Sequence, residues 1–335
     1  MSGESVISVR NIKTYFYSGN RCNKAVNGVS FEIRRGRTLC VVGESGCGKS
    51  VTASSIMQLL PRLSRIEEGE VVYHKEDHTD VVLSKLKKNG KEMRSFRGKD
   101  IAMIFQDPMT ALNPVFRVGW QIMENIRYHE KISKAEARKR TLALLKQMGI
   151  PEPEKRIDQY PHEYSGGMRQ RAMIAMAMSC MPRVLLADEP TTALDVTIQA
   201  QIFELMNKLK KEYNTAIMLI THDMGVVSEM ADDVIVMYMG NVVESGTARE
   251  VLKNPVHPYT RALLASIPIM GKGKKQQLQP IRGMTPNPYN RPKGCQFEPR
   301  CDYACEKCRE CMPDETTLDG SHMVRCHCHK EVAGV

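Results

Sequence analysis

A glycine-rich segment, GESGCGKS at 43 to 50, carries residue types that can bind the phosphates of a nucleotide. Its three glycines allow a tight turn whose backbone N–H groups point inward at phosphate oxygens. Lys49 can reach the β- and γ-phosphates, and the hydroxyl of Ser50 can ligate Mg²⁺. An apolar run precedes the segment and a helical pattern follows it, which is the order that this motif requires. Cys47 is interpreted as filling the loop rather than as a reactive thiol. The predicted phosphate-loop residues are Gly43, Glu44, Ser45, Gly46, Cys47, Gly48, Lys49, Ser50 and Val51.

A second segment, VLLADEP at 184 to 190, is an apolar strand pattern that ends in two acids. Asp188 is placed to hold Mg²⁺, directly or through water, and Glu189 to accept hydrogen bonds from an attacking water. A pair of acids after an apolar run is common at the start of a loop, so this signal is strong only because the phosphate loop is in the same chain. Together the two segments predict hydrolysis of a nucleoside triphosphate.

Between these two segments, YSGGMRQR at 164 to 171 opens an apolar helical pattern. Ser165 is a favoured residue type at a helix N-terminus, and an N-cap is the simpler interpretation. The same serine and glycines can also form an anion site. A chain with one phosphate loop has no evident need of a second anion site of its own.

Seven of the eleven cysteines lie between Cys295 and Cys328. The amino terminus lacks the pattern of a signal peptide, so we expect an intracellular protein, where clustered cysteines bind metal more often than they form disulfides. The spacing CxxxCxxCxxC at 301 to 311 offers several overlapping ligand sets. Four thiolates suit a [4Fe-4S] cluster or a tetrahedral zinc ion, and a tail of uncommitted thiols is the alternative. The arginines expected to offset the thiolate charge are Arg300, Arg309 and Arg325.

Short apolar runs bounded by turn residues predict the strands that position these segments. They lie at 38–43, 101–105, 184–188, 216–221 and 233–238. Longer helical patterns, such as 133–149 and 196–213, lie between them. Strands that alternate with helices predict an α/β fold with a largely parallel sheet. The interval from 107 to 182 lacks a convincing strand and is predicted to be a helical insertion.

Composition supports a folded chain with one large domain and an appendage, or with two domains, because 335 residues with 42% apolar content can bury a sizeable core. No stretch approaches the roughly 20 apolar residues that span a bilayer. The net charge of +10 is concentrated at 85–99 and 272–300. Since no nucleic-acid motif accompanies these runs, we expect solvated loops and no nucleic-acid partner.

Taken in order along residues 6 to 245, the motifs resemble the ATP-binding subunits of ABC transporters. The resemblance is carried by the phosphate loop, Gln106 in IFQDP, the Ser-Gly-Gly turn, LLADEP, TTALD and His222 in ITHD. It implies a P-loop ABC ATPase core, with a RecA-like parallel sheet, an antiparallel β edge and a helical subdomain. It also implies ATP and Mg²⁺ as cofactors and ATP hydrolysis coupled to transport.

The resemblance assigns roles to the residues at the motif positions. Glu189 corresponds to the catalytic glutamate and His222 to the switch histidine that contacts the γ-phosphate. The residues implied in catalysis are Glu189, His222, Gln106 and Lys49. Those implied in holding Mg²⁺ are Ser50, Gln106 and Asp188. Those that would serve the ATP of an opposite subunit, in a head-to-tail dimer that sandwiches two nucleotides, are Ser165, Gly166, Gly167, Gln170 and Asp195.

An aromatic platform for adenine is expected shortly after the first strand in ABC proteins. The stretch KTYFYS supplies Tyr15, Phe16 and Tyr17, and the spacing favours Phe16. The chain departs from the family pattern at Tyr164, where a leucine is common, and at Val51, where many phosphate loops carry a hydroxyl. Neither departure removes a residue that hydrolysis requires.

Three further stretches resemble the dipeptide, oligopeptide and nickel importer branch. They lie at 101–119, 254–268 and 294–301. The branch implies a second ATPase subunit that is often non-identical, two transmembrane permeases and an external solute-binding protein, at the cytoplasmic face of the cell membrane. The segment DPMTALNPVF, after Gln106, would contact a coupling helix of a permease. Members of the branch carry cysteines, some with an iron-sulfur cluster, at positions matching Cys295, Cys301, Cys308 and Cys326. This chain adds Cys305, Cys311 and Cys328.

The sequence therefore predicts an ATPase subunit that powers import of di- or oligopeptides. An importer of nickel or another small solute is the alternative within the class, and a redox-sensing or electron-transfer protein regulated by ATP is the alternative from another class. The predicted domains are an ABC nucleotide-binding domain at 1–253 with a helical subdomain at about 107–182, an extension and linker at 254–293, and a cysteine-rich, iron-sulfur module at 294–335.

Overall fold

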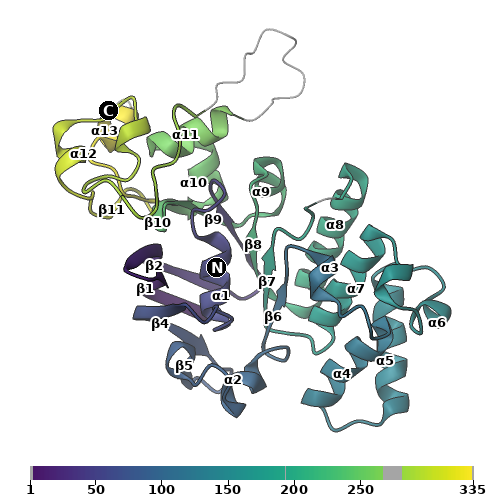
Figure 1. Cartoon of the computed structure of the whole chain (residues 1–335). Helices are drawn as coiled ribbons and strands as arrows, with labels where there is room; N and C mark the ends of the chain where they lie inside the picture. The colour runs from purple at the N-terminus through teal and green to yellow at the C-terminus, as the bar shows by residue number, and fades with distance from the viewer. Residues whose placement is uncertain (1–2, 193, 267–280, 334–335) are drawn as a thin grey trace. The chain divides into compact units, whose positions relative to one another are not determined.

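The computed structural model describes residues 3–192, 194–266 and 281–333 (Figure 1). The chain forms two compact units, and each takes segments from several parts of the sequence. The first unit comprises Met1–Ile7, Ile33–Thr38 and Tyr73–Ile220, and the second comprises Ser8–Glu32, Leu39–Val72 and Thr221–Val335. Residues 267–280 of the predicted extension and linker lie outside the described residues.

The sheet of the first unit consists of three parallel strands, β6 (Ile101–Ile104), β7 (Val184–Asp188) and β8 (Ala216–Ile220). All three are nearly continuous aliphatic runs, and both β7 and β8 are buried at every position, as expected for a parallel sheet covered on both faces. The register pairs Ile101 with Val184 and Asp188 with Ile220. The carboxyl ends of the strands therefore lie at one edge of the sheet, where the predicted acids begin.

Every described element between β6 and β7 is helical. The elements are α3 (Pro108–Ala111), α4 (Val118–His129), α5 (Lys134–Gln147), α6 (Pro153–Arg156), the 3-10 turn η2 (Pro161–Glu163) and α7 (Gly166–Met178). Gly119 is required where α4 meets the turn after α6, because a Cβ there would collide with the Ile157 side chain, and the Gly119 N–H donates to the Ile157 carbonyl at 3.0 Å. The remaining elements are β5 (Asp80–Val82), η1 (Leu83–Lys85), α2 (Lys91–Phe96) and α8 (Val196–Tyr213).

In the second unit, β3 (Thr38–Val42) runs parallel to β9 (Asp233–Tyr238), and β10 (Asn241–Thr247) returns antiparallel to β9. The short strands β12 (Met323–Val324) and β11 (Thr316–Thr317) extend this sheet beyond β10, with Glu244 paired to Val324. The cysteine-rich end of the chain is thus joined by backbone hydrogen bonds to the edge of the sheet that begins with β3.

A second sheet contains β1 (Ser5–Ser18), β2 (Arg21–Arg34) and β4 (Ser64–His74), in the order β2-β1-β4. A two-residue turn at 19–20 joins the first two strands, with Gly19 at φ +56°, as hairpin turns of this length favour. The helices of this unit are α1 (Lys49–Ile56), α9 (Met224–Met230), α10 (Ala248–Lys253), α11 (Pro258–Ala265), η3 (Glu298–Arg300), α12 (Glu306–Glu310) and α13 (His329–Ala333).

The predicted α/β fold is confirmed, and β7 and β9 match their predicted ranges of 184–188 and 233–238. Residues 281–293, part of the predicted linker, have no regular element, yet they are anchored. The Arg291 guanidinium donates to the carbonyls of Met239 and Lys24, both at 2.6 Å. Among the described helices, none is long and apolar enough to cross a membrane.

Candidate functional site

The glycine-rich loop connects β3 to α1 and requires glycine for two separate reasons. Gly48, the N-cap of α1, has φ +106°, and Gly43 has φ +149°. A Cβ on Gly43 would collide with the carbonyl oxygen of Met237, and one on Gly48 with that of Ala25. The loop therefore packs directly against neighbouring backbone in a conformation that other residues rarely adopt.

Lys49 is folded back into this loop. Its ammonium donates to the carbonyls of Gly43 at 2.6 Å and Glu44 at 3.1 Å, and the residue is only 6% exposed. The Cys47 thiol is also buried, and burial raises its pKa, so it stays protonated and acts as packing. Ser50 and Ser45 are exposed, as ligand-binding groups of this loop must be.

Gln106 and Glu189, both of which the resemblance assigns to catalysis, come together in the first unit. The Gln106 side-chain amide donates to Glu189 Oε2 at 3.0 Å, and the Thr192 hydroxyl donates to the same oxygen at 3.1 Å. Glu189 has φ +44°, an uncommon value for glutamate that turns the chain sharply after β7. Asp188, at the end of β7, is 6% exposed. Sequence reasoning missed Thr192, although it lies in the TTALD stretch.

The serine-glycine turn and TTALD supply the N-caps of two helices in the same unit. Ser165 caps α7 and accepts from the Met168 N–H at 3.3 Å, and Asp195 caps α8 and accepts from the Ile198 N–H at 2.9 Å. A Cβ on Gly167 would lie 3.2 Å from Ile198, so the two helices approach closely at this point. Gly166 is exposed, and Gln170 is buried with no hydrogen-bond partner for its Nε2 among the described residues.

The three aromatic residues near the end of β1 differ in their contacts. Tyr15 donates to Asn27 at 2.9 Å, and Tyr17 donates to Glu67. Phe16 is half-buried.

The predicted site residues divide between the two units. His222 is exposed just after β8 and belongs to the second unit, as do Phe16 and the phosphate loop. Gln106, Asp188, Glu189 and the helix caps belong to the first unit.

Three cysteines of the C-terminal segment (residues 281–333) form a compact group. The Sγ of Cys305 lies 3.5 Å from that of Cys308 and 3.4 Å from that of Cys328, and all three sulfurs lie within 4.8 Å of one another. Such spacing suits ligands of a single metal ion. Cys311 is close to these cysteines in the sequence but is not part of the compact group. Its Sγ lies 3.7 Å from His327 Nε2.

The four cysteines predicted to hold a cluster, called here the wide group, share only Cys308 with the compact group. Burial, together with the charges of neighbouring cysteines, raises the pKa of Cys295 and Cys301 to about 11 and that of Cys326 to about 12. Cys308 is among the neighbours that act on each of the other three. Without a cation that stabilises their thiolates, these thiols stay protonated at neutral pH. Thiolate sulfur is nevertheless the ligand type that zinc and iron-sulfur clusters take.

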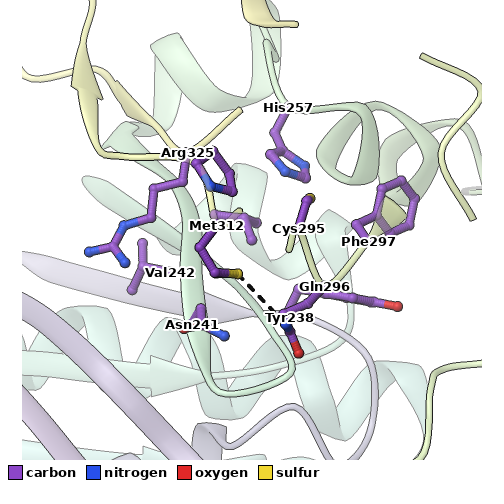
Figure 2. A pocket seen from close by; sticks show the side chains of 11 residues that line it. Tyr238, Asn241, Val242, His257, Cys295, Gln296, Phe297, Met312 and Arg325 are labelled. Atoms are coloured by element: carbon purple, nitrogen blue, oxygen red, sulfur yellow. Dashed lines mark hydrogen bonds between the residues drawn. The ribbon is translucent and has the colours of Figure 1, made fainter. Parts of the chain in front are cut away.

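A small pocket adjoins this group (Figure 2). Cys295, Gln296, Arg325 and His257 are among its lining residues, and the Gln296 amide contacts Met312 Sδ at 3.6 Å. Gln296 Oε1 and Arg325 Nε are buried there without a hydrogen-bond partner in the described part of the chain.

The three arginines expected to neutralise the thiolates each pair with a carboxylate. Arg309 pairs with Glu298 at 3.0 Å and Arg325 with Glu315 at 3.2 Å. Arg300 pairs with Glu44 of the phosphate loop at 2.6 Å. A carboxylate offers two fixed oxygens to a guanidinium, which explains this pairing.

Comparison with known proteins identifies the family. The ABC transporter family model matches residues 26–192, and the model of the oligopeptide/dipeptide transporter C-terminal region matches residues 243–308. The dipeptide transport ATP-binding protein DppD of Bacillus subtilis is 48% identical over 324 residues, which are 96% of this chain and 94% of the relative. The oligopeptide transport ATP-binding protein AppD of the same organism is 47% identical, over 98% of each chain.

Solved structures agree with this assignment. The ATP-binding cassette MJ0796, in a dimeric post-hydrolysis structure bound to ADP and Pi, superposes with a TM-score of 0.64 at 27% identity. The match covers 72% of this chain and 99% of that one. ABC ATPases hydrolyse ATP and couple hydrolysis to transport. The chain belongs to the ABC transporter ATP-binding proteins and, within them, to the oligopeptide/dipeptide transporter family.

Proposed function

We propose that this chain is the ATP-hydrolysing subunit of an importer of di- or oligopeptides. The observation that carries the proposal is identity of 46–48% to peptide transport ATP-binding proteins over almost the whole chain, including the C-terminal region. The names of these relatives favour peptides over nickel or another small solute. No relative named here is an electron-transfer protein, and transport itself needs no electron, so that alternative lacks comparable support.

The proposed site for this chain's own ATP combines binding and catalytic groups. The phosphate loop and Lys49 bind the phosphates, and Phe16 is the platform for adenine. Ser50, Gln106 and Asp188 would hold Mg²⁺, which would neutralise charge that develops on the phosphates. The hydroxyl, amide and carboxylate oxygens of these residues are the ligand types that Mg²⁺ prefers.

Glu189 is proposed to orient and deprotonate the attacking water, with His222 contacting the γ-phosphate. The hydrogen bond that Glu189 accepts from Gln106 supports this role, because it joins the catalytic carboxylate to a proposed Mg²⁺ ligand. The same oxygen of Glu189 also accepts from Thr192, which limits the directions in which the carboxylate can point.

A second subunit is proposed to complete each ATP site. Ser165, Gly166, Gly167, Gln170 and Asp195 would serve the ATP of the opposite subunit in a head-to-tail dimer. The exposed Gly166 and the exposed N-terminus of α7 support this, since backbone N–H groups at a helix N-terminus attract phosphate. The dimeric state of MJ0796 is a precedent for such pairing. We propose that the partner is a non-identical ATPase.

The permease contact is proposed at residues 105 to 120, on the cytoplasmic face of the cell membrane. This stretch exposes several large apolar side chains, which a soluble surface rarely clusters. They are Phe105, Met109, Val115, Phe116 and Trp120, each at least 40% exposed. Two permease subunits and an external solute-binding protein would complete the transporter. The proposed domain division stays at 1–253, 254–293 and 294–335.

Import is tested by peptide uptake in cells that carry the complete transporter with Glu189→Gln. We expect uptake to stop, because the amide cannot accept a proton from water. Glu229→Gln, an exposed glutamate on α9, is the matched control and should leave uptake unchanged. Uptake that continues unchanged in the Glu189 variant would contradict the proposal. Uptake of nickel instead of peptide by the wild-type transporter would favour the alternative solute.

For the cysteines, we propose that Cys295, Cys301, Cys308 and Cys326 hold a [4Fe-4S] cluster, with zinc as the alternative. The group would crosslink a segment that has few apolar residues of its own. The two cysteine groups differ in a way that separates these choices, since Cys301 belongs only to the wide group and Cys305 only to the compact one.

Iron, acid-labile sulfide and zinc are therefore measured in protein purified without oxygen, comparing Cys301→Ser with Cys305→Ser. Matched iron and sulfide that disappear in Cys301→Ser and persist in Cys305→Ser would support the cluster. Stoichiometric zinc with the opposite pattern would assign a mononuclear site to the compact group. Absence of both metals from the wild type would contradict a metal centre.

A further inference from the structure

The C-terminal segment holds the phosphate loop through Glu44, the second residue of that loop. Both oxygens of the Glu44 carboxylate accept from the Arg300 guanidinium, at 2.6 and 2.9 Å. The Thr285 hydroxyl donates to one of them at 3.1 Å. Two parallel charged hydrogen bonds fix the direction of the carboxylate as well as its distance, which a lysine could not do.

Arg300 is itself held rigidly. The residue is 5% exposed, and its Nε donates to the Arg282 carbonyl at 2.9 Å. The guanidinium lies 5.8 Å from the ring centroid of Tyr238 and 5.9 Å from that of Phe297, within the range of cation–π attraction. A guanidinium fixed by backbone, two rings and a carboxylate has little freedom, so it defines where Glu44 must be.

Tyr259 fixes the same loop residue by its backbone. The Glu44 N–H donates to the Tyr259 hydroxyl at 2.8 Å. Tyr259 is fully buried, and its ring packs against Tyr238 and Phe297 with centroid distances of 4.7 and 5.4 Å. One cluster of aromatic rings therefore supports both groups that contact Glu44.

The position of Glu44 also affects the position of the Lys49 ammonium, which is proposed to bind phosphate. Lys49 Nζ is positioned by the carbonyls of Gly43 and Glu44, and these are the two residues at the start of the loop. A shift of Glu44 would move both carbonyls, and with them the direction from which Lys49 approaches a phosphate. The Glu44 carboxylate, in contrast, is directed at Arg300 and is not available to ligand.

We propose that Arg300 and Tyr259 are positioning residues for ATP, which act through Glu44 to set the conformation in which the phosphate loop binds phosphates. The C-terminal segment is then part of the nucleotide-binding apparatus, although it contributes no group to the nucleotide. This inference rests on the ATPase activity of the family and is independent of whether the cysteines bind metal.

The test is equilibrium binding of a fluorescent ATP analogue to the full chain with Mg²⁺. Arg300→Gln is expected to weaken binding about tenfold and Tyr259→Phe about threefold, in line with the loss of a buried charged pair and of one neutral hydrogen bond. Arg309→Gln is the matched control, because it removes an arginine–glutamate pair from the same segment at the surface. It should bind as the wild type does.

A double-variant cycle separates positioning from general destabilisation. If Arg300 acts through Glu44, the double variant Glu44→Gln/Arg300→Gln should bind no more weakly than Glu44→Gln alone. Arg300→Lys should restore part of the affinity. In the assembled transporter, Arg300→Gln should raise the KM for ATP and leave kcat within about twofold.

Three results would overturn the proposal. They are unchanged affinity in Arg300→Gln, additive losses in the double variant, or unchanged affinity in Tyr259→Phe. The affinity of Tyr259→Phe decides the matter if Arg300→Gln fails to fold, since loss of one hydroxyl perturbs the fold less than loss of a buried charge. Lys49→Ala identifies failure of the ATP site itself, because it should lose binding even if Arg300 has no role.

Discussion

The two loops that carry the chemistry are held in different ways. In the second unit, the phosphate loop is fixed by Arg300 and Tyr259, which are 5% and 0% exposed. In the first unit, the loop after β7 is held at Glu189 by Gln106, whose side chain is exposed, and by Thr192. Buried charged contacts resist rearrangement, whereas contacts at the surface exchange readily with water.

This difference matches what each loop must do. A loop that binds phosphates gains affinity when its N–H groups and Lys49 are already in place before ATP arrives. The Glu189 carboxylate, which is proposed to act only after a second subunit closes, would have to change partners. We therefore expect variants near Arg300 to alter binding and variants near Glu189 to alter turnover.

The largest expected effect separates binding from turnover directly. Glu189→Gln should lower the ATPase rate of the assembled transporter about a hundred- to a thousandfold while ATP affinity stays within about twofold. Lys49→Ala should weaken ATP binding by a similar factor, because it removes the phosphate-binding charge. Rate and affinity are measured on the same preparations. Loss of affinity in Glu189→Gln comparable to that in Lys49→Ala would remove the distinction.

A second variant breaks the support behind the phosphate loop. Glu244 is fully buried on β10, and its carboxylate accepts from the N–H groups of Val256 and His257 and lies 2.8 Å from His322 Nε2. Glu244→Ala leaves these groups unpaired and should lower the free energy of unfolding by about 3–5 kcal/mol. Thermal or denaturant unfolding measures this loss.

The control for Glu244 is Glu310→Ala, an exposed glutamate on α12. It should change stability by less than about 0.5 kcal/mol. An equal effect of the two substitutions would show that the buried carboxylate does not anchor the C-terminal segment.

Acid should destabilise the second unit, which contains the phosphate loop, through protonation of His257. This residue is buried, its Nδ1 accepts from the Tyr259 N–H at 3.0 Å, and burial lowers its pKa from 6.5 to about 4. The folded state then binds fewer protons than the unfolded state, so stability is complete above pH 6.5 and falls as the pH drops towards 4. The loss should reach at most about 3 kcal/mol.

His257→Asn keeps an acceptor for the Tyr259 N–H but has no proton to gain. Its stability should therefore change less between pH 6.5 and 4 than that of the wild type, as chemical denaturation at each pH would measure. Parallel pH profiles of the two proteins would contradict a titrating His257.

The smallest expected effect lies on the catalytic loop. Thr192→Val removes one of the two hydrogen bonds to Glu189 Oε2 and should lower turnover about two- to fivefold, since Gln106 still orients the carboxylate. Thr191→Val, one residue earlier, is the matched control. ATP affinity should not change in either variant, and a loss of affinity in Thr192→Val would link this loop to binding.

Local patterns were sufficient to predict much of this molecule. The aliphatic runs at 184–188 and 233–238 predicted β7 and β9 to the residue, because a strand buried on both faces leaves a continuous apolar signature. The phosphate loop could be predicted because its glycines allow the positive φ that the turn adopts at positions 43, 46 and 48. Gln106 and Glu189 were both assigned to catalysis by the resemblance, and the structure brings them together because each follows a parallel strand at one edge of the sheet.

Contacts that depend on distant residues could not be predicted in this way. Glu44 and Arg300 are separated by 256 positions, and Arg300, beside Cys301, has the local appearance of a counter-charge for thiolates. The strands β11 and β12 have two residues each, too few for a periodic signal. The compact group of Cys305, Cys308 and Cys328 depends on the return of the chain after β12, which no spacing encodes.

Hydrogen–deuterium exchange of the full chain, wild type against Arg300→Gln, tests the central claim most directly. The account predicts that exchange in peptides covering 43–52 rises about tenfold in the variant while peptides covering 186–196 stay unchanged, because only the phosphate loop depends on Arg300. Unchanged exchange at 43–52, or an equal rise in both regions, would contradict the claim that the C-terminal segment holds the phosphate loop.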